Sequence, residues 1–388
     1  MIPLPSTERI LLGPGPSLIA PRVMRAMAAP VLGHLDPDLL AMMDEVRGRL
    51  GQLFKAPDGS FAFAVSGTGT SGLEAVVANL VDSRTRVLAI VTGYFGDRLA
   101  QVAARYGGHV RRIEVEWGRA CDPEAVRSAL RAEPADVVAV VHAETSTGVG
   151  NPVEAIARER GALVIVDAVT SLGGHPVDIA GWGVDASYSC TQKCIGAPSG
   201  LAPVVFSPRA LDRRVACRSF YLDLALLEDY WLRRKYHHTI SATLVYALRE
   251  ALLAIEEEGL EARWQRHRAH HLALAAGLGA MGLGLLPPEP ERLWTLNAVK
   301  VPEGVNEAAV RKQLLERFNM EIGAGLGPLA GKIWRVGLMG ASSTPQMILT
   351  FLGAFEHVLR ASGATIPPGA GTAAALAALG REAVGDRP

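Results

Sequence analysis

The sequence predicts an α/β protein, in which a mainly parallel sheet of seven strands is flanked by helices and followed by a smaller α+β domain. Two observations support this prediction. Between residues 61 and 207, short β-branched runs alternate with amphipathic stretches, and this alternation is typical of βαβ units. After the proline-rich segment at residues 287–290, the pattern becomes strand, helix, strand, helix. A chain of 388 residues also exceeds one typical domain, so a large and a small domain are expected.

The seven expected strands are short and strongly apolar. The run at residues 162–166, Ala-Leu-Val-Ile-Val, is apolar on both faces, so we expect helices to cover both sides of the sheet. In such sheets, ligands bind at the carboxyl ends of the strands. The expected strands comprise residues 61–65, 87–91, 109–115, 137–141, 162–166, 186–190 and 202–206.

The remaining segments complete the expected domain organisation. Residues 1–20 are expected to form an N-terminal arm that joins the small domain. Residues 21–258 are expected to form the large domain and residues 259–362 the small one. The Ala-rich tail, residues 363–388, is expected to be a loosely held helix.

Further elements are expected outside the central sheet. A long helical region covers residues 241–281, and its acidic patch at residues 256–258 suits a solvated face or a helix end. The other expected elements are a helix at residues 39–54, strands at 294–301 and 333–337, and helices at 307–318 and 345–359.

The composition is that of an ordinary globular protein. Hydrophobic residues make up 49% of the chain and charged residues 20%, and the formal net charge of +0 gives no sign of nucleic-acid or membrane-surface binding. The four cysteines form no Cys-x-x-Cys pair and are too few for a disulfide scaffold. No signal-peptide pattern opens the chain, and no stretch approaches the roughly 18 apolar residues of a membrane span. We therefore expect a soluble, cytoplasmic protein.

Lys193 is a lone lysine in the uncharged segment Ser-Cys-Thr-Gln-Lys-Cys-Ile-Gly. Only six of the 39 basic residues are lysine, so the chain uses arginine wherever a plain positive charge suffices. Arginine stays protonated, whereas a lysine amine in a desolvated pocket loses its proton and attacks a carbonyl to form a Schiff base. Lys193 is therefore a candidate for amine chemistry. A lysine in a surface turn is the structural alternative.

The turn from Ser66 to Gly72, Ser-Gly-Thr-Gly-Thr-Ser-Gly, follows the first strand and opens a helix. Such a turn presents free N–H groups and the positive end of the helix dipole, which suit a phosphate. Gly67, Gly69 and Gly72 also satisfy the dinucleotide pattern Gly-x-Gly-x-x-Gly. The acidic residue that this pattern needs after the next strand is absent from residues 91–95, and the hydroxyls suit a single terminal phosphate. A helix start with Ser/Thr caps is the structural alternative.

Two other strand ends carry polar groups. Asp167 follows the strand at residues 162–166, where a carboxylate could hold a metal, a ribose or a protonated ring nitrogen. A metal is not expected, because the neighbouring Ala-Val-Thr-Ser adds no second carboxylate or imidazole. A capping aspartate is the structural alternative. The segment from His142 to Gly148 follows the strand at residues 137–141 and brings hydroxyls and an imidazole to the same sheet edge.

Together these sites have the parts that pyridoxal 5′-phosphate needs. Its phosphate suits a helix N-terminus, its aldehyde reacts with a lysine, and its pyridine nitrogen pairs with a carboxylate that keeps it protonated, so that the ring accepts electrons. Each motif is unspecific alone, but the ordered combination predicts a site for this cofactor. The glycine pattern by itself keeps a nicotinamide-dependent dehydrogenase open as an alternative of another class.

Several short motifs lie in a characteristic order along the chain. They are Leu-Gly-Pro-Gly-Pro at 12–16, Ser-Gly-Thr-Gly at 66–69, Gly-Tyr-Phe-Gly at 93–96, Glu-Thr-Ser-Thr-Gly at 144–148, Asp-Ala-Val-Thr-Ser-Leu-Gly-Gly at 167–174, Gln-Lys at 192–193, Tyr-His-His-Thr at 236–239, Gly-Leu-Gly-Pro at 325–328 and Arg-Val-Gly at 335–337. With them the sequence, from about residue 11 to residue 359, resembles the class V, fold-type I pyridoxal-phosphate aminotransferases. Within these, it is most similar to the alanine-glyoxylate (serine-pyruvate) aminotransferases.

The resemblance implies a role for each matching position. Lys193 would form the covalent link to the cofactor, and Asp167 would pair with the pyridine nitrogen. Ser146 would lie near the ring hydroxyl and the substrate. The phosphate would be bound by Thr68, Gly69 and Thr70, with Gln192 alongside.

The remaining roles concern the ring faces, the partner subunit and the substrate. Phe95 would stack on one face of the cofactor ring and Val169 would cover the other. Tyr236 and Thr239 would reach the phosphate of the neighbouring subunit, so that the active site is shared within a homodimer. Arg335 would grip the substrate carboxylate as a bidentate fork.

The resemblance also implies a reaction. Alanine or serine would donate the amino group and glyoxylate would accept it by a ping-pong mechanism, giving glycine and pyruvate or hydroxypyruvate. An (S)-ureidoglycine-glyoxylate or a pyridoxamine-pyruvate aminotransferase is an alternative within the family, although the second needs no phosphate cradle. Thr70 stands where some relatives have histidine, and the mobile-loop cysteine of class V cysteine desulfurases has no match.

Overall fold

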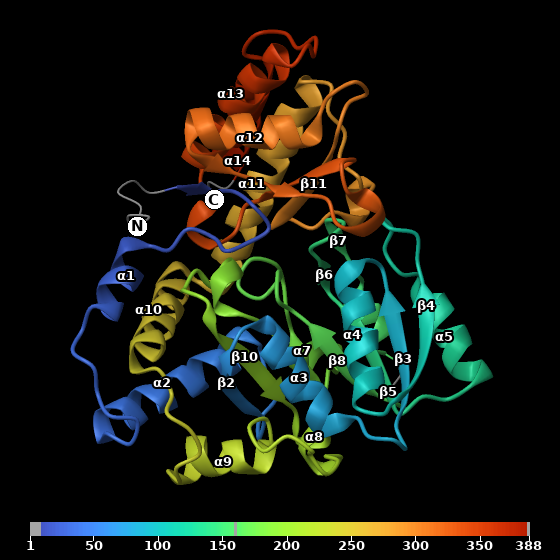
Figure 1. Ribbon diagram of the computed structural model, residues 1–388, viewed down its shortest axis with the longest axis vertical. Helices are drawn as coiled ribbons and strands as arrows, with labels where there is room; N and C mark the ends of the chain where they lie inside the picture. Colours follow the sequence, from blue (N-terminus) through green and yellow to red (C-terminus); the bar gives the residue numbers. More distant parts are fainter. Residues whose placement is uncertain (1–8, 159–160, 386–388) are drawn as a thin grey trace.

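A computed structural model describes residues 9–158 and 161–385 of the chain. The outermost residues of the predicted N-terminal arm and of the predicted tail, 1–8 and 386–388, lie outside the described residues. Figure 1 shows a large domain built around a central sheet and a smaller domain above it, with the first strand of the chain beside the smaller domain.

Seven strands form the central sheet, each within a few residues of its predicted position. Their bounds are β2 Phe61–Gly67, β3 Arg86–Val91, β4 His109–Glu114, β5 Val137–Val141, β8 Leu163–Asp167, β9 Ala186–Tyr188 and β10 Gly200–Phe206. The strand order is β2-β10-β9-β8-β5-β3-β4. β10 is antiparallel to both of its neighbours and every other adjacent pair is parallel, which confirms the mainly parallel seven-stranded sheet.

Helices flank this sheet. Every residue of β5 and β8 is buried, as expected for central strands covered on both faces. Two of the described helices, α2 and α5, begin at an aspartate cap followed by proline, because the carboxylate accepts a first-turn N–H and proline needs no partner there. The helices are α1 Pro21–Met27, α2 Pro37–Leu53, α3 Gly69–Leu80, α4 Tyr94–Arg105, α5 Pro123–Ala132, α6 Val153–Ile156, α7 Ile179–Trp182, α8 Pro208–Asp212, α9 Leu224–Arg233 and α10 Ala242–Glu258.

The small domain combines a three-stranded sheet with helices, as predicted. In this sheet β14 lies between β11 and β13 and is antiparallel to both. A two-residue strand near the N-terminus, β1, pairs in parallel with β12 of this domain. The elements are β1 Ile10–Leu11, α11 Leu260–Ala280, β11 Leu296–Lys300, α12 Glu307–Phe318, β12 Met320–Glu321, β13 Gly323–Ala324, β14 Ile333–Gly337, α13 Pro345–Ala361 and α14 Ala370–Gly385, with the helical turns η2 Glu289–Glu291, η3 Gly327–Leu329 and η4 Gly340–Ser342.

Two sequence-based expectations about helices were wrong in detail. The helical region at residues 241–281 is broken between α10 and α11 at Gly259, whose φ of 83° no helix interior adopts. The Ala-rich helix α14 is not loosely held, because it packs against α11 and α13 and Ala375 is fully buried. The close approach depends on small residues, since a Cβ at Gly277 of α11 would lie 2.8 Å from the carbonyl of Gly371.

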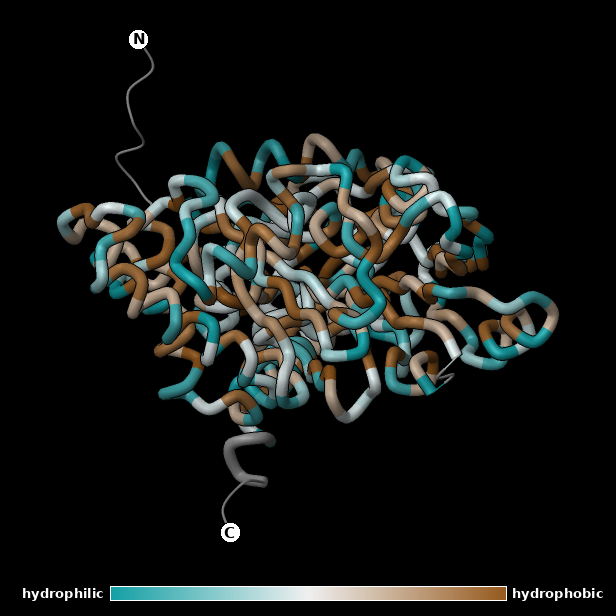
Figure 2. Tube along the Cα trace, turned by 90° about the horizontal axis from the view of Figure 1, so that it is seen from below, coloured by the Kyte–Doolittle hydropathy of each residue, from teal (hydrophilic) through white to brown (hydrophobic). Residues whose placement is uncertain are grey.

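Two hydrophobic cores stabilise the fold. The larger contains buried residues from Val23 to Ile255, and the smaller contains Leu12 together with residues from Ala273 to Ala375. Figure 2 shows hydrophobic segments gathered inside and hydrophilic ones along the outer loops. The domain boundaries at residues 20, 258 and 362 stay a prediction. Within the described residues, none of the helices has the length and apolar character needed to cross a membrane.

Candidate active site

A cavity of about 170 Å³ lies where β5 and β8 end, at the carboxyl edge of the central sheet. Val141, the last residue of β5, and Asp167, the last residue of β8, both line it. The fold thus brings together side chains from loops far apart in the sequence. Eight of the predicted site residues line this cavity: Thr68, Gly69, Thr70, Phe95, Asp167, Val169, Gln192 and Lys193.

The turn between β2 and α3 forms an anion cradle at one end of the cavity. Thr68 is the N-cap of α3, yet its side chain makes no capping hydrogen bond, and Gly69 and Thr70 form the first turn of the helix. First-turn N–H groups have no partner inside a helix, so they are available to an anion. Gly69 lies close to the opposite wall, since a Cβ there would be 3.1 Å from Val169 Cγ2. The cradle is therefore narrow and fits one terminal phosphate.

Asp167, the last residue of β8, is a buried polar residue of the cavity wall, with 6% of its surface exposed. The backbone N–H of Val169 donates to Oδ1 at 2.8 Å, and the Tyr188 hydroxyl donates to Oδ2 at 2.8 Å. Burial raises the pKa of Asp167 to about 7, although these two hydrogen bonds oppose the rise. A carboxylate with this pKa can share a proton with a basic ring nitrogen.

Lys193 lies in the short helical turn η1 (Thr191–Ile195), with φ −110° and ψ −125° that interrupt the helix. Burial lowers the pKa of its amine, which favours the neutral form that attacks a carbonyl. The amine donates a hydrogen bond to the carbonyl of Pro14. Gly15, at φ +107°, makes room for the side chain, because a Cβ there would lie 2.5 Å from Lys193 Nζ. The N-terminal Gly-Pro-Gly-Pro motif thus forms a wall of the lysine site.

Phe95 is held at the cavity by a buried carboxylate. Glu144 accepts the backbone N–H of Phe95 at 3.3 Å and of Gly96 at 3.0 Å, at the start of α4. Ser146 donates to the same carboxylate at 2.5 Å, and its oxygen accepts the backbone N–H of Tyr94 at 2.9 Å. Ser146 is fully buried in this network and is not among the cavity-lining residues, so its predicted role at the ring hydroxyl stays a prediction.

Arg335, on the middle strand of the small-domain sheet, lies at the edge of the site. Its Nε donates to the carbonyl of Ala324 at 2.6 Å, and its Nη1 lies 3.3 Å from the carbonyl of Thr145, a cavity-lining residue. Burial lowers the pKa of Arg335 to about 10, so the guanidinium keeps its charge at neutral pH. Because Nε is engaged with Ala324, a carboxylate would be gripped through the two terminal nitrogens, and Nη1 has a second N–H besides the one that faces Thr145.

Tyr236 and Thr239 are exposed and do not line the cavity of their own chain. The intervening residue His238 nevertheless ties their loop to the cradle, because its Nε2 lies 2.8 Å from the hydroxyl oxygen of Ser66 at the end of β2. Tyr236 packs against His34, with ring centroids 5.0 Å apart. The loop therefore lies beside the cradle. Tyr236 and Thr239, the two residues predicted to bind a phosphate, do not line the cavity of their own chain.

The residues present fit pyridoxal phosphate. The cradle at Gly69 matches a phosphate, and the amine of Lys193 and the carboxylate of Asp167 lie on other walls of the same cavity. Gln192 also lines the cavity, and among the described residues its buried Oε1 has no hydrogen-bond partner, which leaves that amide able to bind a ligand. A buried carboxylate, a desolvated amine and an open helix N-terminus that line one cavity of a fold-type I sheet define a pyridoxal-phosphate-dependent transferase.

Comparison with known proteins narrows this class to one family. Residues 11–349 match the aminotransferase class-V family. The chain belongs to this family of pyridoxal-phosphate enzymes, and its relatives include proteins, 40% and 37% identical to it, that are named as a transaminase and an aminotransferase. The glycine pattern at residues 67–72 therefore does not indicate a nicotinamide site.

Three relatives illustrate the range of substrates in the family. The (S)-ureidoglycine–glyoxylate transaminase of Bacillus subtilis is 40% identical over 95% of this chain and 94% of its own length. The crystal structure of an alanine–glyoxylate aminotransferase from Nostoc sp. has a TM-score of 0.90 and 45% identity, covering 93% of this chain and 97% of its own. A pyridoxamine-pyruvate aminotransferase from Mesorhizobium loti has a TM-score of 0.93 and 32% identity, covering 98% and 99%.

Sequence reasoning missed three residues that the fold brings to the site. Tyr188 donates to Asp167 from the adjacent strand β9, Glu144 anchors the start of α4, and Pro14 accepts from the Lys193 amine. Glu144 and Pro14 lie inside motifs quoted above, so the sequence marked both positions but did not indicate what either residue does. The two cysteines beside Lys193, Cys190 and Cys194, are buried, and burial raises the pKa of each thiol to about 12, which argues against a nucleophile.

Proposed function

We propose that the protein transfers the amino group of alanine or serine to glyoxylate, giving glycine and pyruvate or hydroxypyruvate by a ping-pong mechanism. The observation that carries this proposal is the placement of the Lys193 amine and the Asp167 carboxylate in one cavity beneath the cradle at Gly69. Glyoxylate also appears in the names of two of the three relatives described above.

The proposed roles follow from the geometry. Bound pyridoxal phosphate supplies an electron-accepting ring that stabilises negative charge at the substrate Cα. Burial lowers the pKa of Lys193, which favours the neutral amine, and a neutral Nζ can accept the proton from Cα and later return it to the neighbouring carbon. Asp167 holds a proton at the ring nitrogen through its buried carboxylate. Arg335 binds and orients the substrate carboxylate from the edge of the site.

A ureidoglycine donor is the second candidate. The Bacillus subtilis relative with this name is 40% identical over almost the whole chain, and its crystal structure has a TM-score of 0.94 to this fold. Both candidates use glyoxylate as acceptor, so only the donor separates them. A pyridoxamine substrate is disfavoured, because the cradle at Thr68 to Thr70 would then have no phosphate to bind.

A half-reaction screen tests the donor. The purified yellow enzyme is mixed with alanine, serine, ureidoglycine or pyridoxamine, each without acceptor, and the absorbance of the lysine-bound cofactor is followed. We expect loss of this absorbance with alanine or serine and its return on addition of glyoxylate. If only ureidoglycine causes this loss of absorbance, the amino donor is ureidoglycine, and the second candidate replaces the first. Turnover of pyridoxamine would refute the argument from the phosphate cradle.

Replacing Arg335 with glutamine is expected to raise KM for both the amino donor and glyoxylate by about 10- to 100-fold, because a charge-assisted grip on their carboxylates is lost. The kcat value should fall less than kcat/KM. The control is Arg317→Gln on α12, in the same domain. An unchanged KM for both substrates would remove Arg335 from the site.

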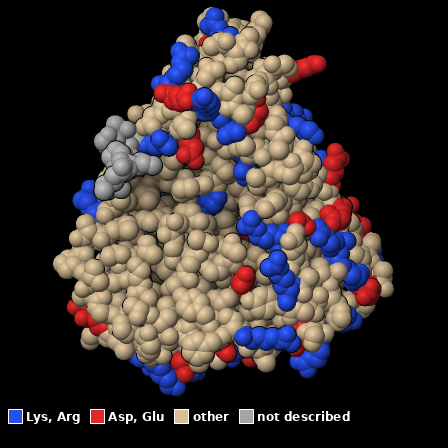
Figure 3. All heavy atoms as spheres, viewed as in Figure 1, with Lys and Arg blue, Asp and Glu red and all other residues tan. Residues whose placement is uncertain are grey.

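A homodimer with shared active sites is also proposed. Exposed aromatic and apolar side chains form a contiguous patch, in which Tyr236 contacts His34 and His237 contacts Phe220. Phe220 is 72% and Tyr236 61% exposed, which is unusual for such large side chains. Figure 3 shows that the side of the large domain over α1, α2 and α10 carries few charged residues. Such a surface suits burial against a second copy of the chain.

Mixing two inactive variants tests the shared site. Lys193→Ala removes the amine, and Tyr236→Ala combined with Thr239→Ala removes the groups that would reach the partner's phosphate. If the sites are shared, mixed dimers contain one complete site and regain activity that neither variant has. If each chain binds its own cofactor with its own Tyr236, mixing restores nothing. Sedimentation of the wild-type protein as a monomer would also contradict the dimer.

The cytoplasm is the proposed compartment. All four cysteines are free, and three of them are buried, so the described residues contain no disulfide that would indicate an oxidising environment.

A further inference from the structure

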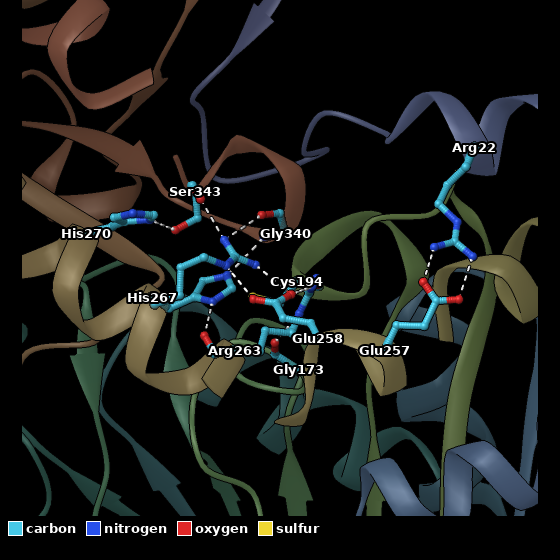
Figure 4. Close-up of polar contacts among 11 residues, drawn as sticks. Arg22, Gly173, Cys194, Glu257, Glu258, Arg263, His267, His270, Gly340 and Ser343 are labelled. Carbon is cyan, nitrogen blue, oxygen red and sulfur yellow. Dashed lines mark hydrogen bonds and ion pairs between the residues drawn. The ribbon is translucent and has the colours of Figure 1, made fainter. Parts of the chain in front are cut away.

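A buried arginine outside the cavity joins the two loops that carry Lys193 and Asp167. Arg263, on α11, has only 6% of its surface exposed. Its Nε donates to the carbonyl of Gly173 at 2.9 Å, and its Nη2 donates to the carbonyl of Cys194 at 2.8 Å (Figure 4). Cys194 directly follows Lys193, and Gly173 lies near the end of the loop that Asp167 begins. One planar group therefore joins the segment that carries Lys193 to the loop that begins at Asp167.

The orientation of this guanidinium is fixed by an ion pair. Its third nitrogen, Nη1, donates to Glu258 at 2.6 Å, and Arg266 Nε donates to the same carboxylate at 2.5 Å. Glu258 is the last residue of α10 and Arg263 lies in the first turns of α11, so the pair bridges the break at Gly259. Burial lowers the pKa of Arg263, and the charge of Glu258 opposes this effect.

A second residue on the same face of α11, His267, contacts the segment that carries Lys193 through Gly340. His267, four residues after Arg263, accepts the backbone N–H of Gly340 on Nε2 at 3.1 Å. Its Nδ1 lies 2.8 Å from the carbonyl of Arg263, which can only accept, so the imidazole is neutral with its proton on Nδ1. Gly340 packs against the lysine segment, because a Cβ there would lie 3.2 Å from the Cys194 carbonyl and 3.4 Å from that of Lys193.

Stability is a weak reason for burying this group. Removing a guanidinium from water costs free energy that a buried ion pair rarely returns in full, whereas an apolar residue of similar volume often stabilises more. The fixed directions of the guanidinium donors can instead set the separation of two carbonyls that belong to different loops. An ammonium group donates all of its hydrogen bonds from a single nitrogen, so it lacks the fixed separation of Nε and Nη2 that holds the two carbonyls apart.

We propose that Arg263 is a positioning residue that fixes the Lys193 segment relative to the Asp167 loop and thereby aligns the amine and the carboxylate across the cavity. The inference rests on the proposed function, in which these two side chains act on one cofactor. Arg263 contacts neither the cavity nor its ligands, so it acts only through the two carbonyls.

Hydrogen exchange in the cofactor-free protein tests the contact directly. In Arg263→Lys and Arg263→Met, amide exchange in residues 168–175 and 191–197 is expected to rise about tenfold, which is the scale of losing hydrogen bonds from a charged donor. The matched controls are Arg268→Lys and Arg268→Met, on the same helix but exposed. Exchange elsewhere should stay at the wild-type rate. A uniform rise across all segments, or unchanged rates in these two, would overturn the proposal.

A second readout separates positioning from simple stability. In the loaded enzyme, the midpoint of the pH titration of the cofactor absorbance should shift in Arg263→Lys but not in Arg268→Lys. The kcat value should fall about tenfold while KM for the donor stays within about twofold, since no substrate contact is lost. An unshifted midpoint with wild-type kcat would overturn the proposal, as would failure of both Arg263 variants to fold. If wild-type protein binds no cofactor, the proposed function fails, and the exchange experiment still decides the role of Arg263.

Discussion

Replacing Lys193 with alanine is expected to lower kcat by at least about 10³-fold, because the variant loses both the covalent anchor and the group that moves the proton at Cα. The amine lies on the cavity wall with a pKa lowered by burial, and the carbonyl of Pro14 is its nearest protein acceptor. Among the residues that the structure describes, Lys193 is the one lysine that lines the cavity. Steady-state turnover of alanine and glyoxylate measures the loss directly.

Two comparisons make this result specific. Lys235→Ala removes an exposed lysine that pairs with Asp229 and should leave kcat unchanged. Lys193→Arg keeps a positive charge but supplies no neutral amine, so it should be as inactive as Lys193→Ala. Turnover of Lys193→Ala near the wild-type rate would end the assignment of this residue, and activity in Lys193→Arg would reduce its role to that of a charge.

Replacing Asp167 with asparagine is expected to lower kcat by about 10²- to 10³-fold, the scale of removing one preorganised electrostatic group from an active site. An amide cannot hold the ring nitrogen in its protonated form, so the ring accepts electrons less readily. The backbone N–H of Val169 can still donate to the amide oxygen, and the Tyr188 hydroxyl can turn to accept from the amide nitrogen. The fold should therefore persist. A kcat within tenfold of wild type would contradict the role of Asp167.

The same substitution should affect stability in the opposite direction. Burial raises the pKa of Asp167 from 3.8 to about 7, so between these values the folded cofactor-free protein binds a proton that the unfolded chain has released. Stability then falls as pH rises through this window, and the cost is fully present above pH 7. Asp167→Asn removes this cost. We expect the cofactor-free variant to melt above the wild type at pH 8 and together with it near pH 4, as measured by calorimetry. A difference that does not depend on pH would contradict the buried charge.

Local patterns were sufficient for much of the fold. The strand at residues 137–141, the helix at residues 307–318 and the strand at residues 333–337 have the bounds predicted from the sequence. These predictions succeeded because apolar periodicity and β-branched runs are properties of neighbouring residues. The glycine turn, Asp167 and Lys193 were singled out from local patterns, and the family resemblance added Phe95, Val169 and Gln192. All of these line one cavity, since the carboxyl ends of parallel strands meet at the same edge of a sheet.

Other features depended on contacts between distant segments. The close packing of α14 on α11 requires glycines on two helices about 90 residues apart in sequence, which no local pattern expresses. The role of Ser146 at the cofactor stays a prediction, and only the folded chain brings its hydroxyl within reach of Glu144 and of the N–H of Tyr94 at the start of α4.

The sequence by itself determined the α/β class, the order of the chemical groups and the family to which the chain belongs, because each of these is carried by short runs and their spacing. The tertiary structure alone decided which groups hold those residues in place: Tyr188 on Asp167, Pro14 and Gly15 around Lys193, and Arg263 between their loops. Hydrogen bonds and the space for a side chain are set by atoms a few ångströms apart, and in the contacts just named these atoms come from positions up to 179 residues apart in the chain.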